Sequence, residues 1–311
     1  VYTLAAYAQH DMEIVKNLSA TLGVRYTKHG TFGNNFTPKV SLMYAPGNFR
    51  FRAAYSRGFR APGLDELYYH YFKIMGKRPV ITFGNTSLKA ERSHYVSLSA
   101  EYSNRIFTLS VMGYMNFVSD MIVKENIAVD DDIRKELAEQ FPEATADQLA
   151  QLKTYGHYIN SNKGIVKGVQ ANASVNVTPD LTLMVNYAYT YGRSKTGGEW
   201  INLERTFKNS FTAGANYSHT WRNYTLGVNL NSRFQSRTYY PSYEDAPGYG
   251  VVNLNTTHTF TVGRMFRLMP SIGVDNIFDK TDHRVDTDTR RYALYSPGRM
   301  FVVGLKVNFA K

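Results

Sequence analysis

The sequence predicts an all-β fold, an antiparallel transmembrane β-barrel, on three observations. The first is strict alternation in segment 301–309, FVVGLKVNF: one face has Phe301, Val303, Leu305, Val307 and Phe309, and the other has Val302, Gly304, Lys306 and Asn308. Successive side chains of a strand point to opposite faces, so one face here is apolar. Second, the pattern recurs about a dozen times with aromatic residues near the segment ends, as in barrels with lipid outside and a polar lumen. Third, the segments are longer than the ~5–6 residues of a soluble strand and suit a tilted bilayer crossing.

The composition fits a barrel better than a helical membrane protein. The chain has 24 Tyr, 18 Phe and no Cys in 311 residues. Its mean hydropathy of -0.37 is too polar for membrane helices, and no stretch approaches the ~20 apolar residues that a spanning helix needs. The net charge of +11 is spread along the chain instead of forming a basic stripe, which argues against nucleic-acid binding.

The alternation predicts thirteen strands. It is clearest in 181–191 and 224–235, where Leu, Val and Tyr alternate with Thr, Asn, Gly and other small or polar residues. The small or polar set is expected to face the lumen. The thirteen strands are expected near residues 2–9, 17–28, 36–45, 48–58, 91–103, 105–124, 158–177, 181–193, 208–219, 222–237, 248–259, 265–278 and 297–309.

Short and long connections take turns along the chain. The short ones are 10–16, 45–48, 102–104, 177–180, 219–222 and 260–264. The long ones are 29–36, 59–90, 125–157, 194–207, 238–247 and 279–296. Outer-membrane barrels have short periplasmic turns and long extracellular loops, so the first and last strands are both expected to run toward the periplasm.

An odd strand number is unusual, because bacterial single-chain barrels have an even number. Open sheet edges in lipid would also leave backbone groups unsatisfied. Residues 1–311 are therefore expected to be the C-terminal portion of a larger barrel; no signal peptide is visible, so an exported protein would begin upstream. Segment 125–157 is expected to be an extracellular loop insertion with helical character: acidic residues at 130–132 suit a helix N-terminus, and Ile133 and Leu137 follow at helical spacing.

Five segments carry recognisable motifs. They read AYAQHD at 6–11, YSRGFRAPGLDELY at 55–68, GNTSLKAE at 84–91, GVDNIFDK at 273–280, and Gly298-Arg299 followed by a strand that closes at Phe309. In this order they resemble the motifs of TonB-dependent outer-membrane receptors, across nearly the whole chain. Thr86 and Ala90 depart from the pattern, because the family usually has Pro at both places.

The resemblance implies a 22-stranded barrel in the outer membrane of a Gram-negative bacterium. It implies an N-terminal plug, which with roughly nine strands would precede residue 1. Such receptors are not enzymes. They import scarce, bulky nutrients such as ferric siderophores, haem or cobalamin, energised by a TonB partner that contacts a motif ahead of the plug. A surface lipoprotein is a further possible partner, beside the outer-membrane lipid.

Haem is the first ligand hypothesis. The family's haem branch carries a His between the two central motifs, and here His70 lies there, with Tyr68, Tyr69 and Tyr71 beside it and Arg60 in the first motif. Imidazole is a good axial ligand for haem iron, and aromatic side chains would stack on a porphyrin. The plain alternative is that His70 is a packing residue. No intrinsic cofactor is expected; haem or a ferric complex would be the transported ligand.

A ferric siderophore is the alternative ligand, because Arg and Tyr suit an anionic catecholate complex. The candidates are Arg233, Arg237, Tyr239, Tyr240, Tyr243, Arg290 and Arg291. Carboxylates at Asp282, Asp286 and Asp288 suit Ca²⁺, although solvated loop acids are commoner. An outer-membrane enzyme would need a nucleophile and a base placed together, and no such motif is present in the sequence. An adhesin barrel is the third alternative, and the five motifs disfavour it.

Overall fold

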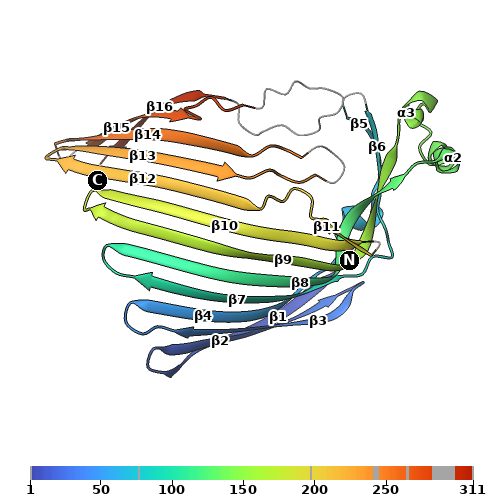
Figure 1. Cartoon of the computed structure of the whole chain (residues 1–311), viewed down its shortest axis with the longest axis horizontal. Coiled ribbons are helices and arrows are strands. Elements are labelled where there is room, and N and C mark those ends of the chain that lie inside the picture. The colour runs from blue at the N-terminus through green and yellow to red at the C-terminus, as the bar shows by residue number, and fades with distance from the viewer. Residues whose placement is uncertain are drawn as a thin grey trace.

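A computed structural model describes residues 2–75, 78–196, 198–240, 245–263, 266–281 and 298–309. Thirteen strands follow one another in chain order as a single curved antiparallel sheet (Figure 1). The fold class is therefore confirmed. Within the described residues, β1 pairs only with β2 and β16 only with β15, so the sheet is not closed.

The thirteen strands of the main sheet are β1 (Thr3–Val15), β2 (Leu18–His29), β3 (Gly33–Tyr44), β4 (Phe49–Arg60), β7 (Glu91–Ser103), β8 (Phe107–Ala128), β9 (Thr154–Thr178), β10 (Leu181–Thr196), β12 (Asn209–Trp221), β13 (Tyr224–Gln235), β14 (Tyr249–Val262), β15 (Phe266–Asp275) and β16 (Met300–Phe309). The loops contain β5 (His70–Met75), β6 (Arg78–Phe83), β11 (Glu199–Asn202), α1 (Leu64–Tyr68), α2 (Asp131–Gln140) and α3 (Ala146–Ala150).

All thirteen expected strands are present, and the three loop strands were missed. The expected turn at 10–16 was too long, because β1 continues to Val15 in its pairing with β2. The expectation of a long loop at 29–36 was wrong, because β3 begins at Gly33 and pairs there with His29. The His29 Nδ1 atom accepts hydrogen bonds from the backbone N–H groups of Thr31 and Phe32, both at 3.2 Å. Gly33 adopts a φ of 70°, a conformation that glycine enters without a Cβ clash. These interactions close the hairpin tightly.

The two ends of the sheet differ, as Figure 1 shows. Short turns connect the strands at one end, and the C-terminus lies there; we call this the turn end. Two of the two-residue turns contain a left-handed residue, Asn17 with a φ of 66° and Arg222 with a φ of 50°. The loop strands and all three helices gather at the opposite end, which we call the loop end. Among the described residues, no helix has both the length and the apolar character needed to cross a membrane.

Strand register places the polar residues on one continuous face. Asn229 of β13 lies opposite Asn216 on one neighbour and Asn255 on the other. Along this face, Asn231 donates to Asn229 at 2.9 Å, and Asn253 donates to Asn231 at 3.0 Å. We call this the inner face, since hydrogen-bonded amides suit a polar lumen.

Apolar residues occupy the other, outer face. In β7 the exposed side chains alternate with less exposed ones, and Val96 and Leu98 belong to the exposed set. Leu305 of β16 also lies on this outer face. The next residue, Lys306, lies on the inner face, because the strand pairings place it on the same side of the sheet as Asn229. One face is thus suited to lipid, and the other to water or a plug.

The two faces predict opposite responses to the same new residue. In the full-length protein, Leu305→Arg should impair assembly, because an Arg on the lipid face near the bilayer midplane costs roughly 2–4 kcal/mol. Lys306→Arg, the matched control on the inner face, should assemble normally. The measurement is the heat-modifiable, folded fraction on a gel of outer-membrane extracts. Equal yields of the two variants would contradict the assignment of the faces.

Candidate functional site

Two long loops fold together at the loop end of the sheet. Strands β5 and β6 form a hairpin within the loop between β4 and β7. β6 also pairs with β9 in a short parallel segment, Thr82 opposite Gly156 and Phe83 opposite His157. This pairing joins the loop of residues 61–90 to the loop that carries α2 and α3 (Figure 1).

Helices α2 and α3 pack on this hairpin. The Asp130 carboxylate accepts a hydrogen bond from the Ile133 N–H at 2.8 Å and caps α2, and Thr145 with Gln148 forms a capping box on α3. The apolar faces of the helices meet Ile81 of β6 in a small core, in which Phe141 is only 1% exposed. The five buried members of this core are Ile81, Leu137, Phe141, Leu149 and Leu152.

Tyr155 of β9 lies at the edge of this small core. Burial, with the nearby carboxylates of Glu136 and Asp130, raises the pKa of Tyr155 above its ordinary value. The phenol therefore stays neutral and packs as an apolar ring against Phe83, with ring centroids 5.6 Å apart. The loop insertion is thus a packed element of the structure.

His70 is packed against this core. Its ring stacks on Phe141 with centroids 4.4 Å apart and an interplanar angle of 17°, and it meets Phe83 edge-on at 5.5 Å. His70 nevertheless remains exposed to solvent. The plain packing role therefore has direct geometric support, whereas axial ligation of iron stays a prediction.

The predicted aromatic ligands do not converge with His70. Side chains of a strand alternate, so Tyr71 lies on the face of β5 opposite to His70, and Tyr69, the C-cap residue of α1, precedes the strand. These two tyrosine rings contact each other, with centroids 5.2 Å apart. Tyr68 ends α1 and is exposed. The structure therefore separates His70 from its neighbouring tyrosines.

Arg60 is held by two carboxylates. Its guanidinium binds both Glu91 oxygens, at 2.7 and 2.8 Å, and the Glu66 carboxylate at 2.9 Å. Glu91 also accepts a hydrogen bond from the Ile122 N–H at 2.8 Å. Planar bidentate contacts of this kind are strong and directional. This cluster ties α1 and β8 to the tops of β4 and β7, so the Arg60 guanidinium is already occupied.

The second motif completes this anchor. The Gly84 N–H donates to the Tyr69 carbonyl at 2.7 Å, and the Asn85 N–H donates to the Glu66 carbonyl at 2.8 Å. A Cβ on Gly84 would lie 2.5–2.6 Å from the backbone of 67–69, so only glycine fits there. Leu67 and Leu88 are buried against Ile122. The motif residues therefore close the base of the loop, a structural role that local sequence alone did not reveal.

The other predicted ligand residues lie near the loop end of β13. Arg233 is an exposed residue of the inner face, opposite Thr212 and Val251. Its guanidinium has no ion-pair partner among the described residues. Arg237 instead pairs with Asp245 at 3.2 Å. Arg233 is thus the one predicted arginine within the described ranges whose guanidinium is left without a carboxylate.

A polar pocket of about 250 Å³ lies between the loops that follow β10 and β13. Arg237 and Tyr239 line it together with Asn202 and Thr206. Tyr239 is fixed through its backbone, which donates to the Thr206 carbonyl at 2.9 Å and accepts from Arg205 at 2.8 Å. The backbone of Tyr240 donates to the Asp245 carboxylate at 3.1 Å. Sequence reasoning missed Asn202 and Thr206, because their placement depends on the path of another loop.

Several predicted residues lie outside the described residues: Tyr243, Asp282, Asp286, Asp288, Arg290 and Arg291. Within the described ranges, no group of three or more His, Asp or Glu side chains is arranged to hold a metal ion.

The family is decided by a match over most of the chain. Residues 1–277 match the family described as TonB dependent receptor-like, beta-barrel. The chain belongs to this family. It is therefore part of an outer-membrane β-barrel of a Gram-negative bacterium, and its family is one of receptors and transporters.

Curated relatives and solved structures agree with this assignment. The ferrienterobactin receptor of Escherichia coli is 24% identical over 291 residues, 88% of this chain and 36% of the relative. Hemoglobin-binding protein A of Haemophilus influenzae is 23% identical over 343 residues, 96% of this chain and 32% of the relative. The ferric enterobactin receptor of Pseudomonas aeruginosa, solved with enterobactin, shares the fold with a TM-score of 0.71 and 18% identity, over 99% of this chain and 45% of that one. The chain spans less than half the length of the curated relatives it matches.

The carboxylate cluster around Arg60 predicts a local effect. In the full-length receptor, Glu91→Gln should loosen residues 61–90, because a hydrogen bond to a charged group contributes roughly 1.5–3 kcal/mol, less where solvent screens it. Amide exchange in this loop should accelerate about tenfold, the equivalent of ~1.4 kcal/mol, while the strands are unchanged. Glu139→Gln on exposed α2 is the matched control. Unaltered exchange in 61–90 would show that the loop is held by other contacts.

Proposed function

We propose that the full-length receptor imports an iron complex across the outer membrane, energised by a TonB partner. Family membership supports the transport role. The relatives support iron as the cargo, since one is a ferrienterobactin receptor and another is a haemoglobin-binding protein. As a receptor it would bind and release its ligand unchanged, with no catalytic step.

The ligand class we propose is an anionic ferric siderophore. The observation that carries this is Arg233 on the inner face, whose guanidinium has no carboxylate partner among the described residues and which is close along the chain to the pocket lined by Arg237 and Tyr239. A guanidinium offers a planar set of donors to anionic oxygens and stays charged at any physiological pH. A complex descending from the loops would meet this charge on the barrel wall.

Ligand titration tests this proposal. Arg233→Gln in the purified full-length receptor should weaken binding of a ferric catecholate about tenfold, because it removes one charged contact of ~1.4 kcal/mol. Arg105→Gln removes the same charge at the turn end and should bind as the wild type does. Fluorescence quenching on titration is the measurement, and growth on the same complex should require TonB. Identical dissociation constants for the two variants would remove Arg233 from the site.

Haem is the second candidate, favoured by the exposed edge of His70 among aromatic rings. One variant separates ligation from packing. His70→Phe keeps a ring against Phe141 but has no coordinating nitrogen, so it should shift the Soret maximum of bound haem and lower affinity if His70 is an axial ligand. The loop should stay protease-resistant. An unchanged Soret band in His70→Phe would make His70 a packing residue only.

A further inference from the structure

We propose that the outer face at the loop end of β7–β10 binds the phosphate-bearing headgroup of an anionic outer-leaflet lipid. This lipid site is separate from the site of the transported ligand. Its centre is a row of side chains that lie opposite one another on neighbouring strands: Arg92 on β7, Ser119 on β8, Lys163 on β9 and Lys195 on β10. Three of the four are cationic.

Further cations border this row on the same face. Arg193 precedes Lys195 by two residues, and Arg57 lies opposite His94 in the row below. Lys167 comes one row lower again, opposite Tyr191. We call the set the outer basic cluster: Arg57, Arg92, Lys163, Lys167, Arg193 and Lys195.

The cluster points toward lipid and not into the lumen. Arg92 alternates with Ser93 and shares its face with the exposed apolar residues Val96 and Leu98. The inner face of the same strand holds Glu91, which binds Arg60. Because Arg92 is the second residue of β7, the cluster sits at the loop-end border of the apolar surface. Long loops of outer-membrane barrels are extracellular, which puts this border at the outer-leaflet headgroups.

Within the described part of the chain, none of the six members of the outer basic cluster has an ion-pair partner. Lys167 instead lies 5.2 Å from the ring centroid of Tyr191, and Arg193 donates to the Tyr191 hydroxyl at 3.3 Å. Like charges directly opposite on neighbouring strands, as in Lys163 and Lys195, are destabilising. A phosphate between them would turn this repulsion into attraction.

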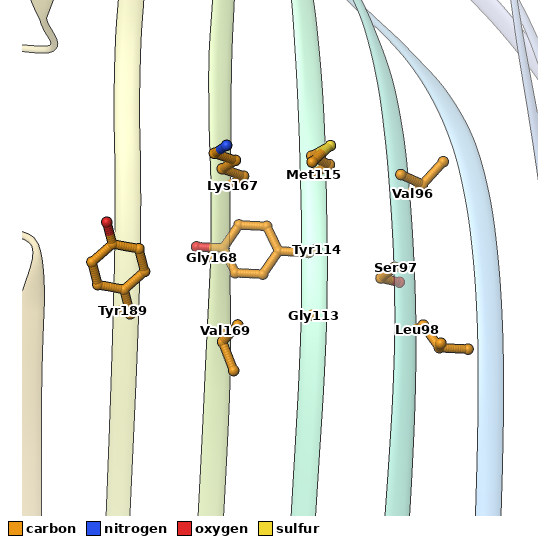
Figure 2. Close-up of a pocket in the computed structure, with 10 residues that line it drawn as sticks. All are labelled: Val96, Ser97, Leu98, Gly113, Tyr114, Met115, Lys167, Gly168, Val169 and Tyr189. Atoms are coloured by element: carbon orange, nitrogen blue, oxygen red, sulfur yellow. The ribbon is translucent and has the colours of Figure 1, made fainter.

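An apolar groove below the cluster suits the acyl part of a lipid. It has a volume of about 530 Å³ and is lined on β7–β10 by Val96, Leu98, Met115, Val169 and Tyr189, with Lys167 on the cluster side (Figure 2). Gly113 forms the open floor, since a Cβ there would meet nothing within 4 Å. Leu98 is six residues from Arg92, roughly 20 Å at ~3.3 Å per residue. A lipid with a phosphorylated headgroup can span both features.

The probe is lipid A, a bisphosphorylated glycolipid, added to the purified full-length receptor in detergent and followed by native mass spectrometry. The triple variant Arg92→Gln, Lys163→Gln, Lys195→Gln should retain at least tenfold less lipid A than the wild type. A control variant that removes three cations at the turn end, Lys16→Gln, Arg105→Gln and Arg222→Gln, should retain it fully. Dephosphorylated lipid A should bind weakly to every form. Heat-modifiability confirms that each variant is folded.

A second variant tests the groove without touching charge. Gly113→Leu fills the open floor and should lower lipid A retention several-fold. Millimolar inorganic phosphate should not displace the lipid, because it lacks the acyl part. Equal retention by the triple and control variants would overturn the proposal. Full displacement by inorganic phosphate would also overturn it, since the cluster would then be an anion site and not a lipid site.

Discussion

Backbone hydrogen bonding in a solvent without water is the constraint on which the rest of the structure depends. Each amide and carbonyl group in the hydrocarbon region must find a partner within the protein. Thirteen strands meet this requirement by pairing in chain order with neighbours on both sides, except at β1 and β16. Register then propagates from strand to strand. A shift of one residue in the register of a strand would move its inner asparagines to the outer face and its outer apolar residues to the inner face. The need to keep apolar side chains toward lipid therefore fixes the register across the sheet.

The loop end obeys a different constraint, because it must hold long connections in place above the sheet. The charge cluster of Arg60, Glu66 and Glu91 anchors the base of one loop, and Phe141 packs the helices of another on the β5–β6 hairpin. The two central motifs, at 55–68 and 84–91, therefore have a structural role in this chain. They position the loops, whereas Arg233 and the pocket beside Tyr239 are left available for a ligand.

The proposed ligand site at Arg233 and the outer basic cluster lie on opposite faces of the same sheet. A cation on the inner face meets a ligand that passes through the lumen, whereas a cation on the outer face meets the surrounding lipid. Residues one position apart on a strand can therefore belong to unrelated sites. The outer basic cluster exists only because β7, β8, β9 and β10 bring residues about a hundred positions apart in the sequence into one row.

The sequence by itself determined the strands, their two faces, the sidedness of the connections and the family, because strand alternation has a period of two and is readable locally. It also placed the helical pattern of the loop between β8 and β9. Only the tertiary structure decided that 29–36 is a tight hairpin, that β5, β6 and β11 exist, that Arg60 is occupied by two carboxylates, and that His70 stacks on Phe141. These features depend on contacts between residues distant in sequence, which no local periodicity encodes.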